Sequence, residues 1–480
     1  MADSMKTSLQ RAQPQRWRIL GLLGVAQLML ILDVTVVAIA LPHIGADLAL
    51  DREALTWVVS GYTLAFGGFL LLGGRAADLF GARRLVLAGL VVFASASLLA
   101  GLATSGSVLL AGRITQGLAA AILAPAALSL VVHLFEGDER NRALGIWSAL
   151  GAGGAALGVL LGGVLTAGPG WRWVLFINVP IGLLLVLGLW TRLPAYPSQH
   201  VGGRLDLLGA ALVTAATGTL IYALIRAGDR GWGTTTTAVL IGVAALLYGA
   251  FALRQRLAAT PLMDLRLLVR RPVTTGTLLI FVATALTIAV FFLGTFYFQN
   301  HRGYGALPTG LLFLPVAVAT MIGANVAGRL IGAAGARALG SGGLLVAALG
   351  MAVPALAEGT AAIAIGVSIV GAGAGVVFVV ASATALGHVE PQEAGLASGI
   401  LSTFHEFGAS LGAAVVSSLA AASIAGATYD GFERGFTTGA AVAAVAAVVA
   451  FFVTPGRPPL SAAGEPASGG APRVSEEVYR

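Results

Sequence analysis

The sequence predicts an all-α protein that crosses a membrane many times, and three observations lead to that fold class. Of the 480 residues, 57% are hydrophobic and only 10% are charged, whereas soluble domains carry about 25% charged residues. The mean hydropathy is +0.91. Long apolar stretches follow one another along the chain, each able to cross about 30 Å of hydrocarbon as a helix. This composition excludes soluble enzymes, nucleic-acid binders and disordered proteins.

Fourteen stretches have the length and composition of a transmembrane helix. They are residues 18–41, 55–72, 85–103, 107–132, 143–167, 173–190, 206–226, 235–253, 273–297, 307–330, 339–356, 359–385, 396–423 and 437–453. The polar N-terminus at 1–17 lies outside these spans. The tail at 454–480 is rich in Pro, Gly, Ser and Ala, and we expect it to be disordered.

The positive charges predict the orientation of the chain. With the N-terminus inside, 21 Lys and Arg residues fall in cytoplasmic segments and six fall outside. Because cytoplasmic loops carry the excess of positive charge, we expect a multi-pass protein of the plasma (inner) membrane. An even number of spans then places both termini in the cytoplasm.

The usage of Cys, Lys and His excludes several kinds of chemistry. The chain has no Cys, its only lysine is Lys6, and its six histidines do not cluster. A thiol nucleophile is therefore impossible, and a phosphate-binding loop of the ATPase type would need an interior lysine. We expect no enzymatic activity, no metal and no cofactor, with an ion gradient as the source of energy.

Two loops repeat the same pattern. Residues Gly74 to Arg83 read GRAADLFGAR and residues Gly328 to Arg337 read GRLIGAAGAR, so both contain G-R-x-x-x-x-x-G-A-R after an even-numbered span. We interpret the repeat as a duplication. It predicts a six-helix bundle at 18–190, a linker with two extra transmembrane helices at 191–272, and a second six-helix bundle at 273–453.

Four motifs resemble those of a known family, the major facilitator superfamily. The loop GGRAADLFGARR resembles its signature after the second helix, and LLAGRITQGLAAA (Leu109 to Ala121) resembles its fourth-helix signature R-x-x-Q-G. LDVTVVAIALP (Leu32 to Pro42) and WRWVLFINVPIG (Trp171 to Gly182) are similar to signatures of its fourteen-helix branch of drug:proton antiporters, the multidrug and quaternary-ammonium exporters. The resemblance implies two six-helix bundles plus two inserted helices, with substrate held between the halves.

The chain also departs from the family pattern. Ala38 replaces an Asn that is usual in the first-helix motif, and Ala155 and Val159 stand where the fifth-helix antiporter signature commonly has prolines. Gly332 is the counterpart of Asp78 in the second loop. The missing prolines weaken the inference of antiport more than the inference of transport.

Three ionisable residues inside spans are candidates for proton coupling. Asp33 and Arg113 reach a similar depth in the first half, at about 21–22 Å from the cytoplasmic side. Arg113 would then tune the proton affinity of the Asp33 carboxylate, although a static ion pair that joins two helices is the alternative. Glu406 lies in the middle of the thirteenth span, on a polar stripe with Ser402 and Ser410. Such a group is costly in a membrane and often functional.

Four residues are candidates for a substrate pocket. Gln116 shares a helix face with Arg113 and is expected to bond either Arg113 or a substrate, with a role in joining helices as the alternative. Phe292 and Phe296 lie in the aromatic stretch FFLGTFYFQN, which would line an apolar pocket or form a belt at the membrane interface. His405 neighbours Glu406, and packing is its alternative role.

Two glycine-containing motifs predict contacts between helices. The family resemblance assigns the first cytoplasmic loop, with Gly74, Asp78, Gly81, Arg83 and Arg84, to an ion-pair network that gates the two halves. A simple topological anchor is the alternative. In the fifth span, the face formed by Gly154, Gly158 and Gly162 is flat enough for close helix contact, and it would act secondarily as a hinge or seal.

The sequence thus predicts a secondary active transporter that exports amphipathic drugs or small organic molecules in exchange for protons, by alternating access, as in bacterial antibiotic resistance. Export of one endogenous metabolite or lipid, or proton symport, remains open as an alternative. A non-transporting membrane receptor is the alternative from another class, but the short loops leave no room for a sensing domain. The expected partners are an amphipathic small molecule, protons and the lipid bilayer, without nucleic acid, for a protein that functions as a monomer.

Overall fold

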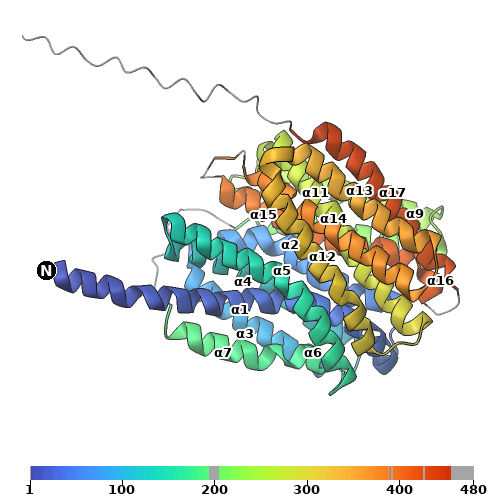
Figure 1. Cartoon of the computed structure of the whole chain (residues 1–480), viewed down its shortest axis with the longest axis horizontal. Coiled ribbons are helices and arrows are strands. Elements are labelled where there is room, and N and C mark those ends of the chain that lie inside the picture. The colour runs from blue at the N-terminus through green and yellow to red at the C-terminus, as the bar shows by residue number, and fades with distance from the viewer. Residues whose placement is uncertain (1, 194–204, 388, 391–392, 425–427, 456–480) are drawn as a thin grey trace, which may run out of the picture.

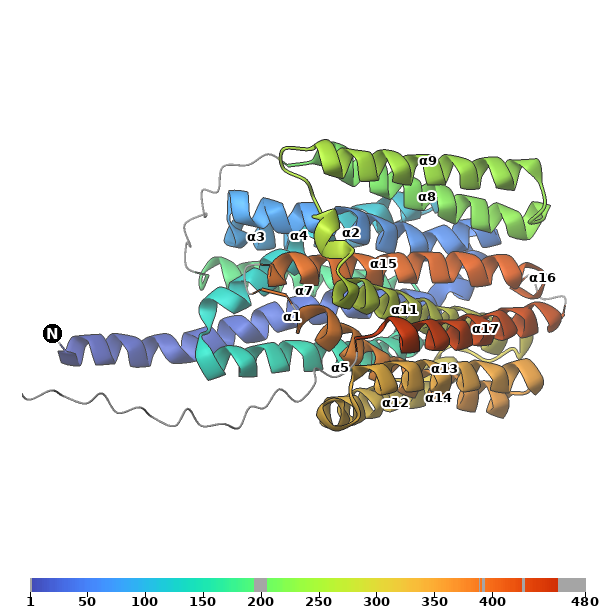
Figure 2. The same ribbon diagram turned by 90° about the horizontal axis from the view of Figure 1, so that it is seen from above.

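Long helices run side by side through the whole molecule (Figure 1). The computed structural model describes residues 2–193, 205–387, 389–390, 393–424 and 428–455, and these ranges contain helices and turns but no strand. Most of the predicted tail and part of the predicted linker lie outside the described residues. The first helix projects beyond the bundle at its N-terminal end (Figures 1 and 2), because it begins at Ala2, well before the expected span.

The helices fall into three groups in chain order. The first group is α1 (Ala2–Leu48), α2 (Arg52–Phe80), α3 (Ala82–Gly101), α4 (Gly106–Leu134), α5 (Gly137–Ala167), α6 (Trp173–Phe176) and α7 (Asn178–Trp190). The second is α8 (Leu207–Arg230), α9 (Thr235–Leu257) and α10 (Leu265–Leu268). The third is α11 (Arg271–Phe296), the π-helix η1 (Tyr297–His301), α12 (Ala306–Ala334), α13 (Ala336–Leu356), α14 (Thr360–Leu386), α15 (Ala394–Leu419), α16 (Ala421–Ile424) and α17 (Asp430–Val453).

The described residues contain 12 helices that are long and apolar enough to cross a membrane. This confirms an all-helical, multi-pass membrane protein, while the count of fourteen spans is not confirmed and stays a prediction. The two expected spans outside the twelve are α5, with 31 residues, and α15, with 26 residues. His405, Glu406 and several serines lower the hydropathy of α15.

The first and third groups each form a bundle of their own, and two helix pairs join them. Within the first group α4 packs on α2 and α3, and α1 packs on α5. Within the third, α14 packs on α12 and α13, and α11 packs on α15. The largest contacts between the groups are α2 against α15 and α5 against α12, and α1 adds smaller contacts with α11 and α12. Helices α8 and α9 pair with each other along one side (Figure 2), where α8 touches both α2 and α15.

The repeated loop motif adopts the same turn in both groups. Gly81 has φ 91° and Gly335 has φ 83°, a region that favours glycine, and each glycine donates its N–H to the carbonyl four residues earlier. The arginine two residues later then holds the end of the last helix of its group. Arg83 Nη2 donates to the carbonyl of Trp190 at 3.0 Å, and Arg337 Nε donates to that of Thr454 at 3.1 Å.

The two ends of the bundle differ in how the halves pack. We call the end with Gly81 and Gly335 the turn end, and the opposite end, where α2 begins, the Arg52 end. Near the Arg52 end, residues of α1 from Val36 to Ile44 share one apolar core with the third group. Nearer the turn end, Ile19 to Leu30 of α1 belong to a separate core of the first group alone. There, among the described side chains, apolar contact between the halves is limited to α2 against α15, where Leu71 packs on Gly399 and Ile400.

A polar cluster fixes the base of the α8–α9 pair. Asp206 caps α8 by accepting from the Gly209 amide at 3.1 Å, and it also accepts from Arg254 Nε at 2.9 Å and Gln255 Nε2 at 3.0 Å. Gln255 Oε1 in turn accepts from the amide of Met263 at 3.1 Å. Burial opposes ionisation of Asp206, but these hydrogen bonds outweigh it and hold the pKa of the carboxyl below its ordinary value.

Replacement of Asp206 by Asn should lower the melting temperature at neutral pH. The group with a lowered pKa contributes fully above its unfolded pKa of about 3.9, and the contribution is lost as the pH falls through the folded value. The difference in melting temperature between wild type and Asp206→Asn should therefore narrow between about pH 5 and pH 3. Thermal unfolding in detergent at several pH values measures this. Asp51→Asn is the control, because Asp51 accepts only from the Ala54 amide at the start of α2; a pH-independent gap for Asp206→Asn would contradict the prediction.

Candidate functional site

Asp33 and Arg113 form an ion pair inside the first bundle. Asp33 lies on α1 and Arg113 on α4, and each residue is 1% exposed. Arg113 Nη1 donates to Asp33 Oδ2. The structure thus brings together the two ionisable residues that the sequence placed at a similar depth in the membrane.

Two amide side chains complete the surroundings of the Asp33 carboxylate. Gln116 Nε2, from α4, and Asn178 Nδ2, from the first turn of α7, donate to Asp33 Oδ1 at 3.0 and 2.9 Å. The same two nitrogens also reach Ser97 Oγ on α3, at 2.6 and 3.0 Å. All three polar side chains are at least 97% buried. Four helices therefore meet in one hydrogen-bonded network.

Helix α2 holds Arg113 from the other side. Arg113 Nε donates to the Val58 carbonyl at 3.1 Å, and its guanidinium lies 4.4 Å from the centre of the Tyr62 ring. A cation over an aromatic face is stabilised by the ring quadrupole. Arg113 Nη1 also donates to Gln116 Oε1 at 2.9 Å, which fixes the orientation of that amide. This network supplies the partners that a buried charge needs.

Glu406 lies on α15 at the contact with α2. A Cβ placed on Gly67 would come within 2.7 Å of Glu406 Cβ, so the two helices touch closely there. The Glu406 side chain is partly exposed, and none of the described residues forms an ion pair or hydrogen bond with its carboxylate. Helix α2 thus lies between the two candidate sites, since Val58 and Tyr62 contact Arg113 and Gly67 lies against Glu406.

A row of hydroxyl groups joins α2 to α15 between Glu406 and the Arg52 end. Thr63 Oγ1 lies 2.6 Å from Ser410 Oγ, and Thr56 Oγ1 lies 2.6 Å from Ser417 Oγ. These pairs are two helical turns apart on both helices. Interhelical hydroxyl contacts of this kind stabilise packing in a membrane.

Arg52, the first residue of α2, ends this row by binding two other helices, α15 and α8. Its Nη1 donates to Ser417 Oγ at 2.8 Å and to the Ser417 carbonyl at 3.1 Å. Its Nη2 donates to the Ile225 carbonyl at 3.1 Å and to Asp229 at 2.5 Å, both on α8. The contact between the halves at this end therefore includes the inserted helix α8.

The four residues assigned to a substrate pocket lie in three different places. Gln116 belongs to the Asp33 network. Phe292 and Phe296 are 2% and 1% exposed and pack on each other within the apolar core of the third group. His405 is close to Thr284, with 2.9 Å between His405 Nδ1 and Thr284 Oγ1, and its ring lies 5.9 Å from that of Phe378. Their role in a pocket stays a prediction.

The first-loop residues face their own half in this structure. Arg83 bonds the end of α7, while Asp78 and Arg84 are exposed, and no ion pair within the described part of the chain joins this loop to the second half. Gly74 lies 3.7 Å from Pro125 of α4 when a Cβ is added. A gating network at this loop stays a prediction.

The glycines of α5 allow close packing on α1. A Cβ on Gly154, Gly158 or Gly162 would come within about 3 Å or less of α1, at Ile31, Thr35 and Val36. The contact with the second half lies on a neighbouring face, where a Cβ on Gly163 would lie 2.9 Å from the Ala306 carbonyl of α12. The three predicted glycines thus lie at a contact within one half.

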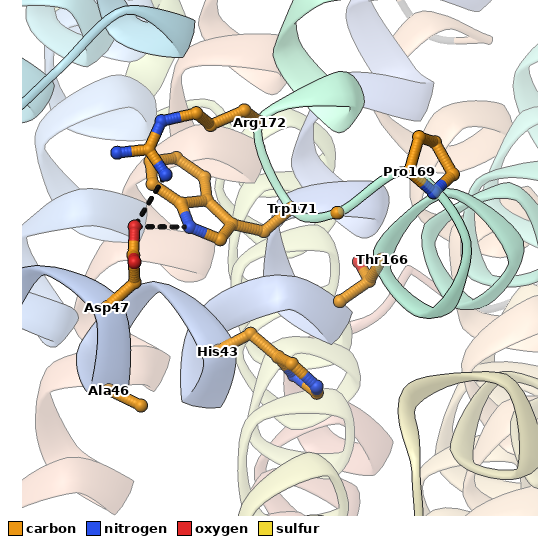
Figure 3. Close-up of a pocket in the computed structure, with 8 residues that line it drawn as sticks. His43, Ala46, Asp47, Thr166, Pro169, Trp171 and Arg172 are labelled. Carbon is orange, nitrogen blue, oxygen red and sulfur yellow. Dashed lines mark hydrogen bonds and ion pairs between the residues drawn. The ribbon is translucent and has the colours of Figure 1, made fainter.

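A pocket of about 470 Å3 opens at the Arg52 end of the first bundle (Figure 3). Asp47 of α1 lies at its edge and accepts from Trp171 Nε1 at 3.0 Å and Arg172 Nη1 at 2.5 Å. Asp47 is 14 residues beyond Asp33 on α1, or about 21 Å along the helix. The pocket contains none of the residues that the sequence assigned to a site.

Sequence reasoning missed Ser97, Asn178 and Tyr62. Each is a neutral polar residue in an apolar span, and nothing in the local pattern tells which neighbour it meets. The signal that could have found Asn178 is its place in WRWVLFINVPIG, a motif that the resemblance had already singled out.

Removal of the cation should destabilise the first bundle strongly. Arg113→Ala leaves the Asp33 charge buried without its partner, and breaking a buried pair costs about 3–5 kcal/mol. Adding Asp33→Asn removes the stranded charge, so the double variant should recover a large part of the loss. Melting temperatures of the purified variants measure both effects. Arg172→Ala, which breaks the exposed pair with Asp47, is the control and should change little; an unchanged melting temperature for Arg113→Ala would show that the pair does not hold the bundle.

Comparison with known proteins identifies the family. The profile described as Major Facilitator Superfamily matches residues 23–413. The chain is 36% identical to the puromycin resistance protein of Streptomyces alboniger, over 90% of both chains. It is 38% identical to the cephamycin export protein of Amycolatopsis lactamdurans, over 82% of both. It is 34% identical to the multidrug resistance protein Stp of Mycobacterium tuberculosis, over 86% of this chain and 77% of that protein.

Solved transporter structures share the fold at low sequence identity. A bacterial homologue of the human lysosomal transporter Spinster, in an inward-facing and unoccupied conformation, has a TM-score of 0.66 and 16% identity, covering 92% of this chain and 97% of that one. A peptide transporter, POT, in complex with alafosfalin has a TM-score of 0.66 and 15% identity, covering 91% and 93%. Together with the family match and the curated relatives, this fold shows that the chain belongs to the Major Facilitator Superfamily and is a multi-pass membrane transporter rather than an enzyme.

Proposed function

We propose that this protein is a proton-coupled exporter of amphipathic small molecules that works by alternating access. The observation that carries the proposal is the Asp33 network, a carboxylate buried in a membrane bundle and surrounded by one cation and two amides. A buried ionisable group of this kind is costly and is often part of a proton pathway. The names of the relatives, which concern puromycin, cephamycin and several drugs, support small organic molecules as cargo.

In this proposal Asp33 and Glu406 take up protons in turn with substrate. Asp33 is held by polar partners, whereas Glu406 has no partner among the described residues and lies at the seam between the halves. An unpartnered carboxylate at the seam suits a group that exchanges a proton or meets a cationic substrate. Inward proton flow would then drive outward flow of the drug, with both termini in the cytoplasm and the turn end facing it.

The pattern of contacts supports the alternating-access part of the proposal. The halves share a core and a hydroxyl row at the Arg52 end, while the first bundle keeps a separate core nearer the turn end. We assign this arrangement to a state that is closed at the extracellular end. The opposite state requires the pairs between α2 and α15 to separate.

An uptake assay in everted membrane vesicles tests the proposal. With labelled puromycin and ethidium as probes, an imposed pH gradient should drive accumulation, and a protonophore should abolish it. Glu406→Gln should fold as wild type does, whereas Asp33→Asn leaves the Arg113 charge without its counter-ion and should fold with a lowered melting temperature. Both variants should lose gradient-driven accumulation. Thr295→Val, a buried hydroxyl remote from both carboxylates, is the control. Wild-type transport by both carboxylate variants would refute proton coupling through these residues, and accumulation only in right-side-out vesicles would favour symport.

A disulfide between α2 and α15 tests whether the contact between the two halves must open during transport. The chain has no native Cys, so Thr56→Cys with Ser417→Cys gives a single defined pair at the position where the hydroxyl oxygens are 2.6 Å apart. Oxidation should crosslink α2 to α15 and stop efflux, and reduction should restore it. Each single-Cys variant is the control. Full efflux by the crosslinked protein would contradict a rocking motion that opens this end.

A further inference from the structure

Every partner of the Asp33 carboxylate in the described structure is a donor. Oδ2 accepts from Arg113, and Oδ1 accepts from Gln116 and Asn178. Arginine has no acceptor atom. Gln116 cannot turn its carbonyl to Asp33, because that oxygen accepts from Arg113 at 2.9 Å. The network as it stands therefore fits the ionised carboxylate, and a protonated one would find an acceptor only if the Asn178 amide turned over to present its carbonyl oxygen.

Of the three donors to Asp33, Arg113 and Gln116 both lie on α4 and are hydrogen-bonded to each other. Asn178 is the third donor, and it lies on α7. It begins α7, directly after the break at Ile177 that separates α6 from α7. Its amide nitrogen bridges Asp33 of α1 and Ser97 of α3, at 2.9 and 3.0 Å. None of the described residues donates to its carbonyl oxygen. The link between α7 and α1 at this depth thus depends on the charge of Asp33.

The geometry points to Asn178 as the positioning residue that sets the pH at which Asp33 releases its proton, with Ser97 orienting its amide. This inference rests on the proposed function and gives α7 a part in it. Hydrogen bonds to the charged form of a carboxyl favour that form. When Asp33 takes up a proton, the Asn178 bond loses its charged acceptor, and this link between α7 and α1 weakens while Arg113 and Gln116 stay bound to each other.

The other groups that face Asp33 do not prevent Asn178 from affecting the pH at which Asp33 releases its proton. Arg113 comes from α4, Tyr62 from α2, and Glu406 of α15 acts only at longer range beyond Tyr62. Helix α3 contributes Ser97, which does not titrate. Helix α5 packs on α1 through glycines, and none of its described residues there is titratable.

Infrared titration of the purified protein in lipid tests the inference without any substrate. The absorption of the protonated carboxyl that disappears in Asp33→Asn reports Asp33, and its pH midpoint is the measured quantity. Asn178→Leu, which is nearly isosteric, should raise that midpoint by about 1–2 pH units, the effect of one hydrogen bond to a charged group. Ser97→Ala should raise it by less. Asn300→Leu is the matched control, because Asn300 donates to the Ile424 carbonyl, far from Asp33.

The outcomes separate this inference from the proposed function. An unchanged or lowered midpoint in Asn178→Leu, with only a loss of melting temperature, would reduce Asn178 to a packing residue and overturn the inference. If Asn178→Leu does not fold, an unchanged midpoint in Ser97→Ala overturns it instead. Gradient-driven efflux that survives in both Asp33→Asn and Glu406→Gln overturns the proposed function but leaves the infrared result standing. Absence of any band specific to Asp33 between about pH 4 and pH 10 would overturn both.

Discussion

The hydrocarbon core of a membrane contains no hydrogen-bond partner for a polar side chain. This constraint governs where the polar residues of the protein lie and what they bind. Buried charges and amides gain most from a partner within the chain, and they occur here in hydrogen-bonded sets, which include the Asp33 network and the Asp206 cluster at the base of α8 and α9. Several buried hydroxyls, those of Thr295 and Ser341 among them, have no such partner within the described structure. Of the two candidate carboxylates, Glu406 is the one that the described residues leave without a partner. That contrast is the physical reason for distinguishing Asp33, a carboxylate bound by several donors, from Glu406, a carboxylate without a bound partner in that part of the chain.

Much of the fold follows from the sequence because hydropathy and length act locally. The apolar stretches mark the helices, and the repeated G-A-R marks two turns of the same form, because both need a glycine with positive φ and an arginine two residues later. Helix ends were less predictable. Polar residues extend α1 back to Ala2 and α17 back to Asp430, where hydropathy gives no signal. The same limit leaves the number of spans unconfirmed, since polar residues make α15 look less like a membrane helix.

The site was predictable only where two charges had to meet. Asp33 and Arg113 reach the same depth in one half, and an ion in hydrocarbon needs a counter-ion, so their pairing follows from the sequence. Ser97 and Asn178 are neutral, and a single amide or hydroxyl has many possible partners. Phe292 and Phe296 show the opposite difficulty, because an aromatic residue suits a pocket and a packed core equally well, and here both lie in the core. The missing information was the direction in which each side chain points from its helix, which residue type does not give.

Helices α8 and α9 are joined to each other by their own side chains. Asp206, Arg254 and Gln255 close the pair at its base without using either six-helix group, and α9 packs mainly against α8. Helix α8 attaches the pair to the two halves, through a buried core that joins Ile221 to Leu64 of α2 and Phe407 of α15, and through the bonds from Arg52. Because α9 packs on α8 and only 17% of its apolar stretch is buried, most of its surface would meet lipid in a bilayer. The α8–α9 hairpin therefore presents the membrane with one wall that belongs to neither half.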